Sequence, residues 1–543
     1  MNKLSESRRN FLKTTSISSV ALMVGFNAKG VLAITHSASR EISISPFVKV
    51  GRNGVVTVVS KHFEMGQGTT TGLTTLIAEE LDADWLTTKV EFAPADANKY
   101  KNLFFGVQGT GGSTAMPNSY DQYRMAGAAA REVLVKAASN RWGVSESSIM
   151  VSNGHLSANG NRAHFGEFVD EASKLTPSEN PKLKDPKNFK LIGNEKLNRK
   201  DNFDKVTGRA IYSSDVKVPG MVYVVIIRSP KFGGILKSFD SSAAKGMEGF
   251  INAMALPNNA GVAVYGKNTW TVLEARKKII TSWDFSKSEK RSTDEMVKDH
   301  KALLNKPTYQ ARKGYTTEQA VEKLKTADQF IETNFLMPFL AHSPMEPVNC
   351  VIEPTKAGIL LHDACQIPTL VQGTLANVLK IKPEQVQIKT YYAGGSFGRR
   401  VSQNCDYLVE AALAFDLLGR RTPVKLLFSR EDDVKGGWYR PMAAQKVKIG
   451  LDQSGEIVAW DHRVAVKSIA KGGPFESVIV KDGIDHFNVE SISDTLYDIP
   501  NLAVGNSDFQ SPIPVLWWRA VGHTQNVLAM ESLVDMVAHA TSR

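Results

Sequence analysis

Residues 392–400 read Tyr-Ala-Gly-Gly-Ser-Phe-Gly-Arg-Arg, between a strand-like run at 386–388 and an amphipathic helical pattern at 406–418. Residues 64–69 read Glu-Met-Gly-Gln-Gly-Thr and also lie between a strand pattern and a helix pattern. Because glycine has no Cβ, such loops let backbone N–H groups approach a ligand, and helix N-termini attract anions. The two loops, far apart in the sequence, predict one extended anionic cofactor held by two domains.

Length and composition indicate a globular protein of about three or four domains. The chain has 543 residues, of which 42% are hydrophobic and 22% charged, and its formal net charge is +11. Lysine and arginine are scattered without a long basic stripe, so we expect no nucleic-acid partner. There are three cysteines, Cys350, Cys365 and Cys405. A cysteine-ligated iron–sulfur cluster usually needs four thiolates, so none is expected on this chain. The sequence is compatible with either one disulfide bridge or three buried thiols.

The N-terminus predicts an export signal over residues 1–33. Residues 7–13 read Ser-Arg-Arg-Asn-Phe-Leu-Lys, a twin-arginine pattern, and an apolar run follows from Ile17 to Phe26. This run is too short to span a bilayer, and Val31-Leu32-Ala33 fits a cleavage site. We therefore expect a periplasmic protein exported by the twin-arginine pathway, with no membrane span in the mature chain.

Local patterns predict several elements around the two loops. Residues 47–60 predict a hairpin with an Asn53-Gly54 turn, and a helix is expected after Gly68. A further glycine-rich stretch, 107–113, precedes an alanine-rich helix at about 120–140. Prolines break regular structure in 174–200, which predicts a linker. Strands follow from 204, a lysine-rich and largely helical stretch covers 285–328, and a second large region begins at 330.

Several passages together resemble the large subunit of the xanthine oxidase family of molybdenum hydroxylases, in the branch of isoquinoline 1-oxidoreductase beta subunits and periplasmic aldehyde oxidoreductases. The early position of the Gly-Gln-Gly loop is typical of that branch. The passages are Asp204 to Tyr212 with Ile227 to Pro230, His362 to Pro368, Ala393 to Gly398, and Trp518 to Gly522.

The resemblance implies an α+β or mixed α/β multidomain fold. It consists of molybdopterin-binding domains and a small aldehyde oxidase/xanthine dehydrogenase a/b hammerhead domain. The expected regions are a first molybdopterin-binding region at 45–173, the linker at 174–200, a hammerhead-like domain at 201–290, and a second molybdopterin-binding region at 330–543. The chain stops in a helical pattern at 530–540 without a capping glycine or proline, which predicts a C-terminal truncation.

The cofactor implied is molybdopterin with molybdenum, in the cytosine dinucleotide form, with no protein ligand to the metal. By resemblance, one set of residues contacts the pterin or its phosphates, Gln366 and the Gly394 loop lie at the metal, and Arg519 supports the pterin. The cofactor-binding residues are Gly66, Gln67, Gly68, Ser113, Gln366, Gly394, Gly395, Phe397, Gly398 and Arg519.

Structural alternatives exist for several of these residues. Gly395 and Gly398 could serve tight turns, and Gln366 could be a surface amide. Ser113 could cap the following helix, and Arg519 could form a cation–π pair with the neighbouring tryptophans. His342 is as well explained by a buried structural role as by a substrate contact.

The sequence departs from the family pattern at three points. Arg399, Arg400 and Val401 stand where purine-oxidising members have a glutamate, so xanthine is not the expected substrate. Without iron–sulfur or flavin motifs, electrons must pass to a small [2Fe-2S] subunit, with a c-type cytochrome as a further acceptor. The family's catalytic glutamate lies in a G-x-G-E segment, and this chain has none, so no catalytic residue is assigned.

The sequence therefore predicts a molybdenum hydroxylase large subunit. It would oxidise an N-heteroaromatic compound of the isoquinoline or quinoline type, or an aldehyde, with water as the oxygen source. The alternative is a truncated, non-catalytic exported binding or scaffold protein that keeps the fold.

Overall fold

The computed structural model describes residues 41–543, so the predicted signal peptide at 1–33 lies outside the described residues. The chain divides into two compact units. Unit 1 comprises the chain up to Ile211 together with Cys365–Leu370, and unit 2 comprises Tyr212–Ala364 and Val371–Arg543. A short segment from the second half of the sequence therefore belongs to the first unit.

Unit 1 is built on an N-terminal sheet of order β1-β2-β3-β4. Its strands are β1 (Glu41–Ser45), β2 (Val48–Gly51), β3 (Val56–Ser60) and β4 (Lys89–Phe92). Antiparallel β2 and β3 confirm the predicted hairpin, with Val50 opposite Val56. Gly54 takes a φ of 80°, which favours glycine at this turn position.

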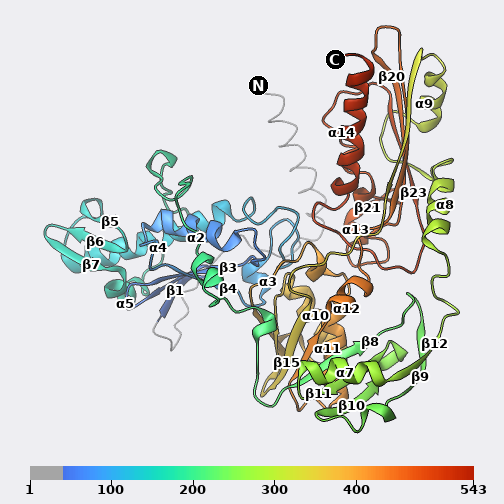
Figure 1. The fold of residues 1–543 in the computed structure, drawn as a ribbon. Coiled ribbons are helices and arrows are strands. Elements are labelled where there is room, and N and C mark those ends of the chain that lie inside the picture. The colour runs from blue at the N-terminus through green and yellow to red at the C-terminus, as the bar shows by residue number, and fades with distance from the viewer. Residues whose placement is uncertain (1–40) are drawn as a thin grey trace. The chain divides into compact units, whose positions relative to one another are not determined.

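Two helices pack on this sheet, α2 (Thr69–Leu81) and α4 (Tyr120–Trp142), as Figure 1 shows. Both confirm the predicted helices. Leu73, Ile77 and Leu81 recur along one face of α2 and are fully buried with the valines of β2 and β3. This spacing of three to four residues places the side chains in one core. A smaller sheet of order β5-β6-β7 joins unit 1 (Met150–Ser152, His155–Ala158, Asn161–His164).

The proline-rich stretch 174–200 contains one short 3-10 helix among its described residues, Pro186–Asn188. It is nevertheless tied to α2. Glu79 accepts hydrogen bonds from the backbone N–H groups of residues 190–192, and Lys184 Nζ lies 2.9 Å from Glu79 Oε1. The buried Glu79 carboxylate thus has both hydrogen-bond donors and a counter-charge. These partners offset the cost of burying a charged group in the core.

Unit 2 contains a central sheet of order β10-β11-β8-β18-β15-β16-β17. Its β8 is parallel to β18, with Tyr223 opposite Lys425. The stretch 201–290 predicted as a hammerhead-like domain therefore shares this sheet with strands from beyond residue 348. In sequence order the strands are β8 (Val222–Ile227), β10 (Phe250–Ala255), β11 (Val262–Gly266), β15 (Asn349–Thr355), β16 (Gly358–Asp363), β17 (Val386–Thr390) and β18 (Val424–Leu427).

Helices cover both faces of the central sheet. Helix α7 (Thr269–Lys278) packs Val272 and Ala275 against the valines of β8 and β11. Helix α11 (Asp406–Leu417), predicted from its apolar spacing, lies on the other face, where the Tyr265 hydroxyl of β11 donates to Ala414 O at 2.9 Å. Helix α10 (Pro368–Leu379) leads into β17, and β9 (Ile235–Asp240) pairs with β12 (Ile280–Asp284).

The C-terminal sheet of unit 2 has the order β13-β23-β20-β19-β14. Figure 1 shows α14 on one face and α8 and α9 on the other. Alternating residues of β19 explain this: Val447 and Ile449 pack with Met530 and Leu533 of α14, while Ala444 faces α8. The elements are α8 (Thr293–Leu303), β13 (Tyr309–Gln310), α9 (Thr317–Leu324), β14 (Gln329–Met337), β19 (Ala443–Leu451), β20 (Ile457–Val466), β23 (Leu502–Asp508) and α14 (His523–Ala540).

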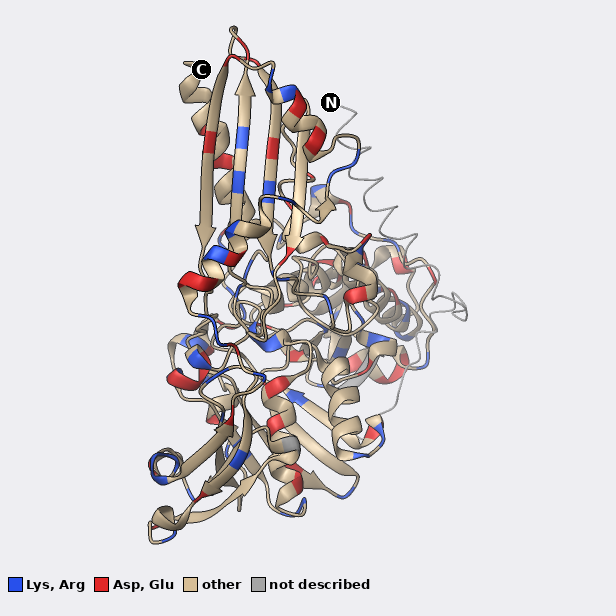
Figure 2. Ribbon diagram, turned by 90° about the vertical axis from the view of Figure 1, so that its right-hand side faces the viewer, with Lys and Arg blue, Asp and Glu red and all other residues tan. Residues whose placement is uncertain are grey.

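Charges of both signs are interspersed on this sheet, as Figure 2 shows. Lys446 Nζ and Lys448 Nζ lie 3.9 and 3.8 Å from the carboxylate of Glu332 on the neighbouring strand. The three cysteines are buried and form no disulfide among the described residues, which decides for thiols over a bridge. None of the helices within residues 41–543 combines the length and apolar character that crossing a bilayer requires.

Candidate functional site

The Gly66–Gly68 loop of unit 1 is closed around a carboxylate from its own chain. Glu64 is fully buried, and its Oε1 accepts the N–H groups of Gly66 at 2.8 Å and Gly68 at 3.0 Å. Its Oε2 accepts both the N–H and the hydroxyl of Thr70, at 3.1 and 2.8 Å. The sequence predicts that the N–H groups of these glycines contact the pterin or its phosphates. In the structure Glu64 takes that place, because an internal carboxylate satisfies the same donors.

Gln67 is also engaged locally. Its Oε1 accepts from Met65 N at 2.8 Å and its Nε2 donates to Phe63 O at 2.7 Å. Gly66 remains open: a Cβ built there would meet no atom within 4 Å, and its φ is 111°. The loop thus offers a ligand an exposed backbone surface at Gly66 rather than a set of free N–H donors.

Thr110 joins the three sequence segments of unit 1 that carry predicted site residues. Its hydroxyl accepts from Phe63 N at 2.9 Å, and its N–H donates to Gln366 O at 3.0 Å. In return Gln366 Nε2 donates to Thr110 O at 2.7 Å. Gln366 is 4% exposed, so it is a buried tether and not a surface amide. These bonds explain why Cys365–Leu370 belongs to unit 1.

Ser113 lies in the exposed part of the 107–113 stretch with a φ of 54°. Helix α4 begins only at Tyr120, with Ser119 at its N-cap position, so Ser113 does not cap it. Left-handed backbone at a residue other than glycine costs about 1–2 kcal/mol. Ser113 is therefore an exposed loop residue with a locally strained backbone.

Sequence reasoning missed two buried basic residues beside Thr110. Lys61 Nζ donates to Asn118 Oδ1 at 2.9 Å and Gln122 Oε1 at 2.6 Å. His62 contacts Thr110 Oγ1 at 3.3 Å and Asn118 Nδ2 at 3.1 Å. Burial lowers the pKa of Lys61 to about 8 and, together with the nearby Lys61 charge, lowers that of His62 to about 3. His62 is therefore neutral at pH 7. Their position after a buried strand was the only sequence signal.

The Gly394 loop of unit 2 is held in the same manner as the Gly66 loop. Glu346 Oε2 accepts from Gly394 N at 2.9 Å and from Arg400 Nη2 at 2.9 Å. A Cβ on Gly394 would stand 2.5 Å from Glu346 Cβ, so this close approach requires glycine. Burial opposes ionisation of Glu346, but Arg400 and the Gly394 N–H outweigh it and hold its pKa below the ordinary value.

The two arginines after this loop are buried structural groups. Arg399 makes a bidentate pair with Asp406 at 2.9 and 2.7 Å, and Arg400 pairs with Glu346. Both side chains are at most 2% exposed. They stand where the sequence lacks the glutamate of the purine-oxidising pattern. Through their ion pairs they hold the Gly394 loop in place.

Phe397 and Arg519 meet in unit 2 although they are distant in sequence. Arg519 N donates to Phe397 O at 2.8 Å, and the guanidinium lies 4.3 Å from the Phe397 ring centroid and 5.2 Å from that of Trp518. Both Phe397 and Arg519 have left-handed backbone, with φ of 56° and 50°. The cation–π alternative for Arg519 thus holds, with Phe397 as an unforeseen partner. Arg519 is exposed, and within the described residues it has no ion pair.

Gly398 and His342 both pack against Trp517. A Cβ on Gly398 would stand 2.1 Å from Trp517 O, and its φ is 105°. His342 Nε2 donates to the same carbonyl oxygen at 2.8 Å. Burial lowers the pKa of His342 to about 4, so it is neutral at pH 7 and its hydrogen bond is structural. Gly395, with a φ of 90°, completes the turn beside the Phe397 ring.

Each unit, taken by itself, carries groups whose chemistry suits an anionic organic ligand. Arg519 supplies an exposed, unpaired positive charge, and Trp518 Nε1 is a buried donor without a partner in the described part of the chain. Gly66 supplies open backbone. Among residues 41–543, no group of three or more His, Cys, Asp or Glu side chains could hold a metal ion.

The comparisons with known proteins identify molybdopterin-binding relatives. Models of the molybdopterin cofactor-binding domain match residues 4–223 and 302–542. The chain is 30% identical to the isoquinoline 1-oxidoreductase subunit beta of Brevundimonas diminuta, over 98% of this chain and 73% of that protein. It is 26% identical to the membrane-bound aldehyde dehydrogenase (pyrroloquinoline-quinone) of Gluconacetobacter polyoxogenes, over 98% of this chain and 70% of that protein.

Among solved structures, quinoline 2-oxidoreductase from Pseudomonas putida 86 matches with a TM-score of 0.52 at 16% identity. The match covers 64% of this chain and 48% of that chain, so this chain corresponds to about half of the solved one. This likeness confirms the mixed α/β multidomain fold predicted from the sequence. The chain belongs to the xanthine oxidase family of molybdenum hydroxylases, as a large, molybdopterin-binding subunit similar to isoquinoline 1-oxidoreductase subunit beta.

Proposed function

We propose that this chain binds molybdopterin with molybdenum, in the cytosine dinucleotide form, and oxidises an N-heteroaromatic compound or an aldehyde with water as the oxygen source. Its 30% identity to a protein named isoquinoline 1-oxidoreductase, over nearly the whole chain, supports the substrate class. The observation that carries the proposal is the pairing of Phe397 with the exposed guanidinium of Arg519. Among the described residues this guanidinium has no carboxylate partner, so an exposed positive charge lies beside the Gly395–Gly398 turn.

When bound, the molybdenum cofactor supplies the two-electron redox chemistry. Arg519 would then hold an anionic part of the cofactor, and Gln366, anchored on Thr110, is proposed to contact it near the metal. Gly66, Gln67, Gly68 and Ser113 are proposed to contact the pterin or phosphate side. Because Glu64 and Gln67 already engage the loop's donors, that contact would use the exposed backbone surface at Gly66 and Ser113. Gly394, Gly395, Phe397 and Gly398 shape the metal side. No residue is assigned as the proton acceptor.

The partners and location belong to the same proposal. We expect a separate [2Fe-2S] subunit to receive the electrons and a c-type cytochrome to accept them in turn. The protein would reach the periplasm by twin-arginine export. The substrate is a small molecule.

The test is the molybdenum content of the chain produced with its iron–sulfur partner and maturation proteins. We expect about one molybdenum per chain by mass spectrometry of the metal, with cytidine monophosphate released on acid hydrolysis. Arg519→Ala should lower that content several-fold. Arg162→Ala, which removes an exposed arginine without an ion pair in the described structure, should not. Absence of molybdenum from fully matured wild-type protein would overturn the proposal in favour of a non-catalytic binding protein.

A further inference from the structure

Unit 2 contains a cavity of about 790 Å³, and Gly394 is the one proposed cofactor residue that lines it. It opens where the parallel strands β8 and β18 lie beside the N-terminus of α7. Lys425 and Tyr223 are direct neighbours across these strands and both line the cavity. Cavities of about 300–1,000 Å³ are typical of small-molecule sites. Size and position therefore make it a candidate binding site.

One end of the cavity is basic. Lys425 is 5% exposed, and its Nζ donates to Ser214 O at 2.5 Å and Val216 O at 2.9 Å. Within the described residues no carboxylate lies within 4.0 Å of this ammonium. Burial lowers the pKa of Lys425, and Asp215 and Glu346 oppose this shift only from beyond ion-pair distance, so a bound anion would supply a direct partner. Two of the three ammonium donors are used, which leaves one for a ligand.

The surrounding charges leave this end positive. Lys217 lines the same end and is exposed. Glu346 accepts from Ser214 N at 3.0 Å, and its charge is paired with Arg400. The Asp215 carboxylate accepts the N–H of Tyr212 at 2.9 Å and is the nearby charge that most favours protonated Lys425, although it forms no ion pair within 4.0 Å among the described residues. The positive end of the α7 dipole, at Thr269, adds to the field.

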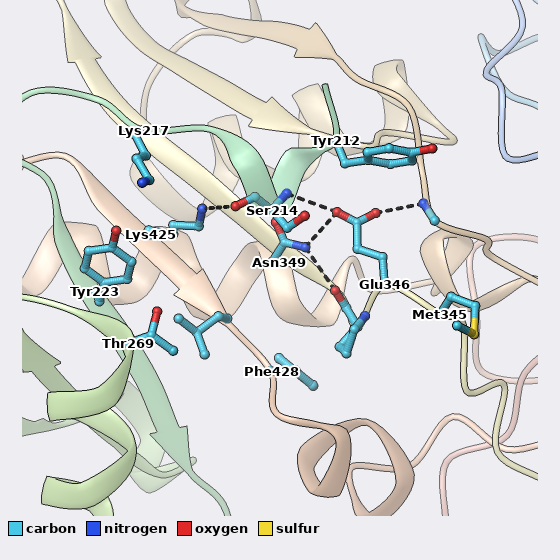
Figure 3. A pocket seen from close by; sticks show the side chains of 13 residues that line it. Tyr212, Ser214, Lys217, Tyr223, Thr269, Met345, Glu346, Asn349, Lys425 and Phe428 are labelled. Carbon is cyan, nitrogen blue, oxygen red and sulfur yellow. Dashed lines mark hydrogen bonds between the residues drawn. The ribbon is translucent and has the colours of Figure 1, made fainter. Parts of the chain in front are cut away.

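The rest of the cavity wall combines apolar side chains with the polar groups of Ser214, Thr269, Glu346 and Asn349. Figure 3 shows Lys217, Lys425 and Tyr223 grouped at one end, and Met345 at the other. Leu427 and Phe428 continue the wall from β18. Leu427 and Phe428 offer an apolar surface next to the basic end, which suits a ligand that carries a negative charge on a flat apolar body.

We propose that this cavity binds a small aromatic carboxylate. Its carboxylate would pair with Lys425 and Lys217 and accept a hydrogen bond from the Tyr223 hydroxyl. Its ring would lie on Leu427 and Phe428. The cavity borders the proposed cofactor residues at Gly394, which lines it, but the binding of a carboxylate here does not depend on the proposed reaction.

The test is calorimetric titration of the purified complex with 1-naphthoate, and with its neutral isostere 1-naphthamide. We expect the carboxylate to bind at least ten-fold more tightly than the amide, because charged hydrogen bonds contribute most here. Lys425→Met should weaken naphthoate at least ten-fold, while Lys425→Arg should retain most of the affinity. Equal affinity for the two ligands, or no binding at millimolar naphthoate, would overturn the proposal.

Lys425→Met also loses the hydrogen bonds to Ser214 O and Val216 O and could misfold, so a second set of variants tests the site independently. Lys217→Ala and Tyr223→Phe change groups at the cavity surface and should each weaken naphthoate about two- to ten-fold without changing the melting temperature. Lys237→Ala, an exposed lysine of β9 that does not line the cavity, is the matched control. Unchanged affinity in both Lys217→Ala and Tyr223→Phe would refute the basic end as the carboxylate site.

Discussion

Replacing Glu64 by glutamine tests whether an internal carboxylate holds the Gly66–Gly68 loop. The amide keeps one oxygen for the N–H groups of Gly66 and Gly68, which lie 2.8 and 3.0 Å from Oε1. Its NH₂ group would then face the Thr70 N–H, now 3.1 Å from Oε2. Two donors would oppose each other, and a buried N–H would lose its acceptor.

The magnitude follows from these contacts. An unsatisfied buried N–H costs about 1–3 kcal/mol. The remaining hydrogen bonds lose their charge assistance, since bonds to ionised groups are roughly twice as strong. We therefore expect Glu64→Gln to destabilise the loop by about 2–4 kcal/mol. Arg199 keeps its partner Asp201, at 2.8 Å, so no arginine is left unpaired.

The assay is hydrogen exchange of the peptide that covers residues 64–72, read by mass spectrometry. A loss of about 2–4 kcal/mol corresponds to at least ten-fold faster exchange, because 1.36 kcal/mol is a factor of ten. Glu195→Gln, an exposed glutamate of unit 1, is the control and should stay within about 0.5 kcal/mol. Unchanged exchange in Glu64→Gln would refute the role of Glu64. It would favour the sequence prediction that a bound anion accepts these N–H groups.

Three further outcomes follow from the structure. Gly398→Ala should lower the melting temperature far more than Gly472→Ala, because only the first Cβ would stand 2.1 Å from Trp517 O, while both positions have positive φ. Burial raises the pKa of Asp363 to about 7 from an ordinary 3.8, so the folded state binds more protons and stability should fall as pH rises between about 4 and 7. In chemical unfolding measured at several pH values, Asp363→Asn should reduce the slope of the unfolding free energy against pH by up to one proton. An unaltered slope would contradict the raised pKa of Asp363. Cys405, whose pKa burial raises to about 12, should resist iodoacetamide at pH 8 until the protein is unfolded, and rapid labelling of the native chain would show that it is accessible.

The candidate site was only partly predictable from the sequence. The pattern located both glycine loops, Gln366 and Arg519, because such motifs carry family identity in a few residues. It did not predict that Glu64 and Glu346 take the donors of Gly66, Gly68 and Gly394. A hydrogen-bond acceptor is chosen by position in space, and the sequence records only which acceptors exist. The ring partner of Arg519 was missed for the same reason, since Phe397 reaches it only through the fold.

The sequence by itself determined the local elements of this protein. The Asn53-Gly54 turn, the start of α2 after Gly68 and the apolar face of α11 follow from backbone preferences and side-chain periodicity, which act over a few residues. Only the tertiary structure decided that β8 joins β18 in the central sheet, and that Cys365–Leu370 belongs to unit 1. These pairings depend on hydrogen bonds and burial between distant segments. The same contacts between distant or neighbouring segments decide which acceptor the N–H groups of a glycine loop bind.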